Sequence, residues 1–302
     1  MTHEPVLLKE VIEVLSPKKG EFFIDGTVDG GGHAREILKK ISPGGKLLGI
    51  DWDKRMIDER RKELAGRNDV ILENDNYTNM VDILKKKKLG KADGILLDLG
   101  FSSEQLESSG RGFSFRRNEP LLMTYSADQK PAHQILREYS EKKIAEIIKD
   151  FGEERFAVRI AKAIKKNLPI LTSKKLADVI ARAVPANYEH GRIHPATRTF
   201  QALRIFVNRE LDNLRQFLEI VLQVMNPGAR LAIISFHSLE DRIVKKEFRE
   251  WRQEGFVEIL TKKPITASIE EKKSNPRSRS AKLRAIKVVS ANINSHRYYD
   301  HN

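Results

Sequence analysis

FFIDGTVDGGGH, at residues 22–33, is a short apolar run that leads through a glycine-rich turn. The run predicts a buried strand over Phe22–Val28, and the segment His33–Lys40 predicts a helix. Glycines let the chain turn tightly and let a ligand approach the backbone, while the first N–H groups of the helix point at that ligand. A strand, a glycine turn and a helix together indicate the first βαβ unit of a parallel sheet.

The same alternation continues over the first hundred residues. Further strands are expected at Lys46–Asp51, Val70–Asn74 and Gly94–Asp98. Helices are expected at Lys54–Ala65 and Tyr77–Lys87. The alternation then stops, which indicates an insertion of another structural class.

Residues 108–203 contain turns and helical periods without a convincing strand, so they predict an inserted all-helical domain. Its expected helices are Ala132–Glu138, Glu141–Lys149, Glu153–Lys166 and Ser173–Val184. A long helix over Thr197–Met225 should end at Asn226-Pro227-Gly228. We therefore expect residues 1–107 and 204–302 to form the two parts of one sheet domain.

The last hundred residues predict three strands, Arg230–Phe236, Phe256–Leu260 and Leu283–Val289, and a helix, Leu239–Trp251. The loop between the last two strands is too poor in helix for a parallel crossover, so these strands should form an antiparallel hairpin. The predicted fold is α/β, a seven-stranded, mostly parallel, Rossmann-like sheet. The hairpin favours a methyltransferase that binds S-adenosylmethionine over a protein that binds NAD.

A nucleoside-type cofactor is indicated by the glycine turn at Gly30, Gly31 and Gly32 together with Asp51, which closes the second strand. An acidic side chain there can accept hydrogen bonds from a ribose diol. The dinucleotide fingerprint G-x-G-x-x-G is absent. Tyr77 could pack on an adenine ring, and Asn76 could bond the adenine amine or merely cap the next helix.

Polar groups leave the fourth strand at the same edge of the sheet, where an acceptor base could lie. Asp98 and the backbone carbonyl of Leu99 or Gly100 could accept hydrogen bonds from the N–H groups of an exocyclic amine, and Phe101 could stack on the base. Asp98 could equally hold the amino group of the cofactor.

The fifth strand and the long helix supply further polar candidates. His237 could face the acceptor, although Ser238 with Asp241 resembles a helix capping box. Arg198 and Arg204 lie on different faces of their helix, so one could meet phosphate and the other a buried carboxylate.

The chain has 302 residues, a net charge of +13 and no cysteine. The charge favours a nucleic-acid partner. The missing thiol excludes cysteine-ligated metals and the covalent thiolate route to pyrimidine C5 methylation. Without a signal peptide or a long apolar stretch, we expect a cytoplasmic protein that does not bind a membrane. No metal is expected.

These residues resemble the bacterial 16S ribosomal RNA cytosine-N4 methyltransferase family nearly from end to end. The matching segments are His3–Leu8, Gly30–His33, Asp93–Ser103 with Gln105, Arg111–Phe115, Gly152–Phe156, His194–Arg204, Ile234–Arg242 and Asn275–Ser280. The resemblance implies N4 methylation of a decoding-region cytidine, either in 16S RNA or in the small ribosomal subunit, by a monomer or homodimer. By matching position, it implies cofactor contacts at Gly31, Gly32, His33, Asp51, Tyr77, Asp98 and Gln105.

The resemblance also implies an RNA-facing arm at Asn275–Ser280. Residues 271–287 hold seven basic residues and one acidic residue, which suits phosphate contacts. With Arg198, the expected RNA contacts are Arg277, Arg279, Lys282 and Arg284.

The sequence departs from the family pattern in two places. Asp29 stands where the family has glycine, and the segment Leu122–Ser126 has lost two acids and a base. This second departure supports a rival function, a catalytically weak RNA-binding factor for ribosome assembly that retains the fold. A nucleotide-dependent oxidoreductase is a second rival, which the absent dinucleotide fingerprint disfavours.

Overall fold

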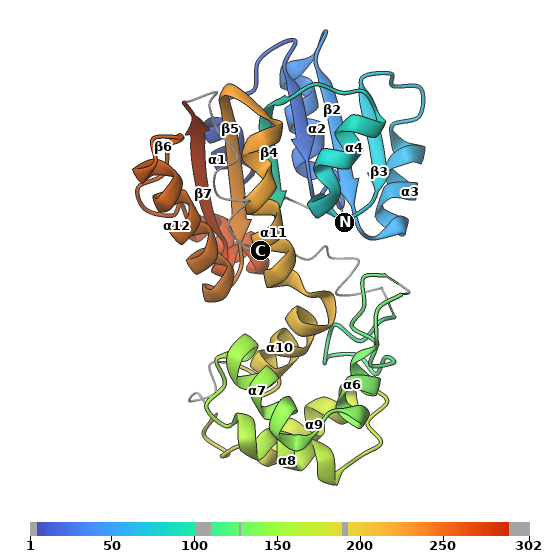
Figure 1. Ribbon diagram of the computed structural model, residues 1–302. Coiled ribbons are helices and arrows are strands. Elements are labelled where there is room, and N and C mark those ends of the chain that lie inside the picture. Colours follow the sequence, from blue (N-terminus) through green and yellow to red (C-terminus); the bar gives the residue numbers. More distant parts are fainter. Residues whose placement is uncertain (1–4, 101–109, 127, 189–192, 290–302) are drawn as a thin grey trace, which may run out of the picture. The chain divides into compact units, whose positions relative to one another are not determined.

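A computed structural model describes residues 5–100, 110–126, 128–188 and 193–289 (Figure 1). The chain divides into two compact units. Met1–Gly100 and Asn213–Asn302 make up what we call the sheet unit, and Phe101–Asp212 the helical unit. The boundaries expected from the sequence lay at residues 107/108 and 203/204.

The sheet unit contains one seven-stranded sheet in the order β3-β2-β1-β4-β5-β7-β6 (Figure 1). Its strands are β1 (Phe22–Asp25), β2 (Lys46–Asp51), β3 (Val70–Asn74), β4 (Ala92–Asp98), β5 (Met225–Ser235), β6 (Val257–Ile259) and β7 (Lys282–Val288). β1 to β5 pair in parallel, whereas β7 is antiparallel to both β5 and β6. The expected mostly parallel sheet with an antiparallel end is confirmed.

Helices cover both faces of this sheet. They are α1 (Leu8–Leu15), α2 (Gly32–Ile41), α3 (Lys54–Glu63), α4 (Met80–Lys86), α11 (Glu210–Val221) and α12 (Ser238–Gln253), with short turns of helix η1 (Tyr77–Asn79), η3 (Leu222–Val224), α13 (Ile269–Ser274) and η4 (Pro276–Ser280). Successive strand residues point to opposite faces. Phe23 and Leu96 therefore pack in one core with α1 and α2, while Ile24 and Leu97 pack in another with α4, α11 and α12.

The described helices of the helical unit surround a separate apolar core. They are α6 (Ala132–Glu138), α7 (Glu141–Gly152), α8 (Ala157–Lys166), α9 (Ser173–Ala183) and α10 (Thr197–Asn208). α7 and α8 are strongly amphipathic and bury isoleucine and alanine side chains at helical spacing. This agrees with the helical character expected for the insertion.

The predicted long helix Thr197–Met225 was wrong as one element. The observed helix α10 ends at Asn208, and Arg209 takes a left-handed conformation (φ 52°) before α11 begins at Glu210. At this helix end the Arg209 N–H donates to the carbonyls of Ile205 and Phe206, and the Asn208 amide donates to the carbonyls of Arg204 and Met123. The predicted stop at residues 226–228 lies in the first residues of β5 instead.

Several other boundaries differ from the expectation. β1 ends at Asp25 and not at Val28, and α8 begins at Ala157 because Glu153 is a left-handed cap of α7. α1, α13 and η4 were not predicted. No described helix has the length and apolar character needed to cross a membrane.

Candidate cofactor and acceptor site

In the glycine turn after β1, the backbone passes close to neighbouring side chains of the protein. Gly31 has φ +71°, and a Cβ atom there would lie 3.0 Å from the Arg60 side chain. At Gly32 an added Cβ would lie 2.9 Å from Pro5. A side chain at Gly31 would be strained by this positive φ, one at Gly32 would require Pro5 to shift, and α2 starts at Gly32 with its first N–H groups at the turn.

Arg60, which the sequence analysis missed, supports the turn from α3. Its guanidinium donates to the carbonyl of Gly30 and pairs with Glu63 at 3.1 Å. Arg60 lies 30 residues from Gly30 in sequence, so no local sequence pattern predicts this contact.

Asp51 closes β2 beside this turn. One carboxylate oxygen accepts from the backbone N–H of Asp29 at 2.9 Å, and the other accepts from Asp53 at 2.8 Å. The side chain is buried, and its burial together with the charge of Asp29 raises the pKa of Asp51 to about 7. Asp29 itself has φ +38°, so this position, glycine in the family pattern, retains the left-handed backbone.

Asp98 and Asp25 end the neighbouring strands β4 and β1, and Thr27 links them. The Asp98 N–H donates to the Thr27 hydroxyl at 2.7 Å, and the Thr27 N–H donates to the Asp25 carboxyl at 3.2 Å. Burial raises the pKa of both carboxyls to about 7, and the negative charge of Asp98 adds to the rise at Asp25. Asp25 was not among the predicted site residues.

Asp25, Asp51 and Asp98 thus end three adjacent strands at the carboxyl edge of the sheet. Buried carboxyls with raised pKa values are typical of binding and catalytic sites. Because ionising them without a counter-charge is unfavourable, the arrangement favours a ligand that carries positive charge.

His33 faces Asp98 from the first turn of α2. Its Nε2 bonds the carbonyl of Val6 at 2.9 Å, which assigns the ring proton to Nε2 and leaves Nδ1 as an acceptor. Nδ1 lies 3.7 Å from a carboxyl oxygen of Asp98. Burial lowers the pKa of His33 to about 4, so the ring is neutral at pH 7. The His33 side chain thus faces Asp98, whereas the His33 backbone lies at the glycine turn.

Tyr77 and Asn76 follow β3. The Asn76 side chain accepts from the N–H of Thr78 at 3.0 Å, which confirms its capping role. The Tyr77 ring meets Phe217 edge-on, with centroids 5.5 Å apart. Its Cβ lies 3.4 Å from the position of an added Cβ on Gly26, which brings it to the strand end beside the glycine turn.

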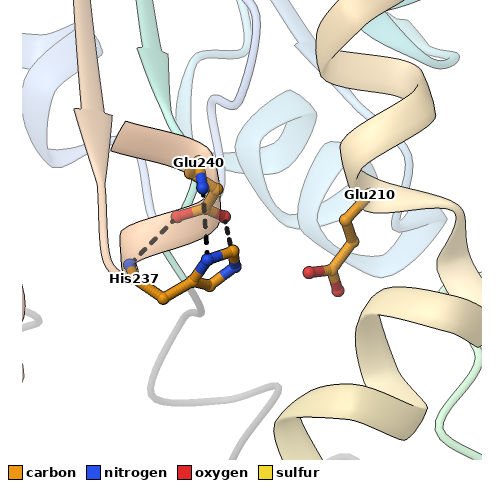
Figure 2. A group of neighbouring side chains, drawn as sticks. All are labelled: Glu210, His237 and Glu240. Atoms are coloured by element: carbon orange, nitrogen blue, oxygen red, sulfur yellow. Dashed lines mark hydrogen bonds and ion pairs between the residues drawn. The ribbon is translucent and has the colours of Figure 1, made fainter. Parts of the chain in front are cut away.

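His237 and Glu240 form a capping box at the start of α12 (Figure 2). His237 Nδ1 accepts from the Glu240 N–H at 3.3 Å, and the Glu240 carboxylate accepts from the N–H groups of Phe236 at 2.7 Å and His237 at 3.3 Å. The expected capping pair was therefore wrong by one residue, because Ser238 is already helical. The negative charge of Glu240 also contributes to the raised pKa of Asp98.

Gly100 lies between Asp98 and Phe236. Its N–H donates to the Asp98 carboxyl at 3.2 Å, and an added Cβ would lie 2.7 Å from the Phe236 ring. Any side chain at this position would displace that ring. Of the other predicted site residues, Phe101 and Gln105 lie outside the described residues.

The predicted RNA contacts divide into two kinds. Arg284 is buried and bonds Asp241 at 2.6 Å, and Lys282 lies 3.4 Å from the same carboxylate. Arg284 thus supports the sheet and has little surface to offer phosphate, which corrects its expected role. Arg279 is exposed, whereas Arg277 and Arg198 are half-buried. Arg204 pairs with Glu210 through two nitrogens, the carboxylate partner that the sequence suggested for one of the two arginines.

The divergent segment Leu122–Ser126 is held by hydrogen bonds within the helical unit. The N–H of Tyr125 donates to Asn208 at 2.9 Å, and Arg111 donates to the carbonyls of Thr124 and Tyr125. Tyr125 also stacks on Phe113 with ring centroids 5.4 Å apart. The residues of the segment Leu122–Ser126 therefore have a structural role in the helical unit.

Comparison with known proteins gives consistent matches. The model of the MraW methylase family matches residues 1–289. The ribosomal RNA small subunit methyltransferase H of Syntrophotalea carbinolica is 44% identical over 94% of this chain and 97% of its own. The proteins of the same name from Coprothermobacter proteolyticus and Thermotoga neapolitana are each 46% identical, over 94% and 95% of this chain and 95% and 96% of theirs.

Proposed function

The chain belongs to the MraW methylase family, and on that premise we propose that it methylates the N4 amine of a decoding-region cytidine in 16S ribosomal RNA. It is a methyltransferase whose cofactor is S-adenosylmethionine. Its relatives are named as methyltransferases of small-subunit ribosomal RNA, which supports the RNA substrate. We place its activity in the cytoplasm, where that RNA is found.

The residues at the sheet edge fit this cofactor. The lack of side chains at Gly30, Gly31 and Gly32 lets a ligand approach the backbone, and the first N–H groups of α2 lie at this turn. The three carboxyls suit a molecule that carries a sulfonium and an ammonium group. We propose that the turn at residues 30–33, Asp51, Tyr77, Asp98 and Gln105 hold it. When bound, it supplies an electrophilic methyl group.

Cofactor affinity should rise with pH. Without ligand, Asp25, Asp51 and Asp98 have pKa values near 7, far above the value in an unfolded chain, so between about pH 4 and 7 the folded protein holds more bound protons than the unfolded chain. Its stability without ligand therefore falls as pH rises through this window. Because the cofactor binds the ionised carboxyls, we expect its Kd to decrease at least about tenfold from pH 5.5 to 7.5.

Titration calorimetry at pH 5.5, 6.5 and 7.5 measures this dependence. S-adenosylhomocysteine, which lacks the sulfonium charge, should show a shallower dependence. A Kd that is the same at all three values would mean that these carboxyls do not change their protonation on binding.

Asp98 is the residue on which the proposed acceptor site for the cytosine amine depends. An exocyclic cytosine amine is a weak nucleophile because its lone pair is delocalised into the ring. We propose that the Asp98 carboxylate and the Gly100 carbonyl accept hydrogen bonds from the two N–H groups of this amine. These bonds localise the lone pair on the amine nitrogen for attack on the methyl group. Asp98 then holds the released proton, since a group with a pKa near 7 suits that task at neutral pH.

His33 and His237 have supporting roles in this proposal. His33, whose Nδ1 lies 3.7 Å from Asp98, places a neutral ring beside the carboxyl that is proposed to hold the proton. His237 fixes Glu240, whose negative charge favours the protonated form of Asp98. Arg198, Arg277, Arg279 and Lys282 are proposed to bind RNA phosphates.

The test is nucleoside analysis after incubation with methyl-labelled cofactor. Naked 16S RNA and assembled small subunits are used in parallel and digested to nucleosides. We expect label in N4-methylcytidine with at least one of the two substrates. Label in a ribose-methylated cytidine would overturn the acceptor assignment, and binding without label in either substrate would favour the assembly-factor alternative.

A further inference from the structure

The helical unit contains a long segment without acidic residues. From residue 155 to residue 177 the sequence has no aspartate or glutamate. Its seven basic residues are Arg155, Arg159, Lys162, Lys165, Lys166, Lys174 and Lys175. This charge is as large as that of the C-terminal arm, and the functional site does not use it.

α8 presents part of this charge on one face. Its apolar side chains, Ala157, Ile160, Ala161 and Ile164, are buried in the core of the helical unit. Arg159, Lys162 and Lys166, which we call the basic stripe, are exposed at the spacing i, i+3 and i+7. This spacing aligns them on one side of the helix over about 10 Å. Figure 1 shows α8 beside α7 and α9 in this unit.

The basic stripe has no ion pair among the described residues, in contrast to three exposed cations of the sheet unit. Lys39, Lys54 and Arg67 each lie within 2.7 Å of a carboxylate oxygen. Within the described part of the chain, no ion pair is found for the three stripe residues.

Helix stability does not account for the stripe. Cations are favourable near a helix C-terminus, which accounts for Lys166 in the last turn of α8, and Lys165 donates to the carbonyls of Leu136, Arg137 and Tyr139 at the end of α6. Arg159, however, lies in the first turn of α8, where a cation is unfavourable, and Lys162 lies in its middle. Like charges at these spacings on one helix are also unfavourable. An external anion would remove this repulsion.

We propose that the basic stripe of α8 binds the phosphate backbone of the RNA substrate. This inference rests on the proposed function and adds a second contact surface to it. The charges along one nucleic-acid strand follow one another every 3.4 Å, so a span of about 10 Å faces about three phosphates. An anionic membrane is a poorer partner, because the apolar face of α8 is already buried and cannot enter a bilayer.

The test compares two triple variants that change the net charge equally. R159Q/K162Q/K166Q removes the basic stripe, and K39Q/K54Q/R67Q removes three cations that have acidic partners. Glutamine retains the helix propensity of lysine and arginine, so both variants should fold, which circular dichroism checks. RNA binding is measured by fluorescence anisotropy with a labelled decoding-region fragment of 16S RNA at 50 to 200 mM KCl.

We expect the stripe variant to bind RNA at least about tenfold more weakly at 100 mM KCl. The slope of log affinity against log salt should become shallower by about 2, the value for three phosphate contacts on a single strand. The control variant should stay within twofold of the wild type, and the Kd for S-adenosylmethionine should be unchanged in both.

Equal RNA affinities for the two triple variants would overturn the inference. So would loss of binding to phosphatidylserine vesicles in the stripe variant while RNA affinity is retained. Failure of the proposed function has a different signature, namely RNA binding by the wild type with no methylated nucleoside.

Discussion

The Asp98→Asn variant should lose methyl transfer by about 10²- to 10⁴-fold in kcat at saturating cofactor and RNA. The amide has the shape of the carboxyl group but can neither draw both protons of the amine nor hold the released one. Its own NH₂ group would also confront the substrate amine with a donor in place of an acceptor. We expect only a modest change in the Kd for RNA.

Asp93→Asn is the matched control, since it makes the same change on the same strand. Asp93 lies near the other end of β4, where its carboxylate accepts from the Phe22 N–H at 2.9 Å and from Asn226 at 2.8 Å. This variant should lose some stability and retain kcat within threefold. A kcat for Asp98→Asn close to that of the wild type, combined with a large increase in cofactor Kd, would show that Asp98 only holds the cofactor and takes no part in the transfer step.

The Asp51→Ala variant should weaken cofactor binding by about 100-fold and leave RNA affinity nearly unchanged. A hydrogen bond to a charged group contributes about 1.5–3 kcal/mol, and about 2.8 kcal/mol corresponds to a factor of 100. The loss combines the proposed ribose contacts with the loss of the N–H bonds that Asp29 and Asp53 donate.

Calorimetry with S-adenosylmethionine and anisotropy with RNA separate these effects. Asp69→Ala serves as the comparison, because Asp69 pairs with Arg67 on the surface and precedes β3. An equal loss of cofactor and RNA affinity in Asp51→Ala would show that the residue acts through the fold.

The sheet was predictable because its strands are short apolar runs separated by helical periods, and because glycines mark the first turn. β2 and β3 have the expected bounds, and β4 and β7 differ by at most two residues. The cofactor edge followed from the rule that ligands lie at the carboxyl ends of parallel strands. Asp51 is beside the glycine turn because β1 and β2 are paired in register.

Features that depend on contacts distant in sequence were not predictable. Arg60 reaches Gly30 from another helix, and the His33 ring turns to Asp98 only because Nε2 bonds Val6. The helix break at Arg209 was also missed, since Asn208 beside it is held by a hydrogen bond to the carbonyl of Met123, 85 residues away.

Local patterns also misled in two places. Ser238 and Asp241 have capping-box spacing, but the helix begins one residue earlier and His237 takes the cap. A histidine is an uncommon cap, so residue preference pointed to the serine. The charge of the arm suggested RNA contacts at Arg284, but this side chain is buried against Asp241.

The most direct test of the account is to locate the transferred methyl group in the RNA. Small subunits and naked 16S RNA are incubated with labelled S-adenosylmethionine, and RNase fragments are then mapped by mass spectrometry. We predict the mass increase of one labelled methyl group on one cytosine base of the decoding-region fragment, which Asp98→Asn abolishes. Label on another nucleotide, or equal label with Asp98→Asn, would contradict it.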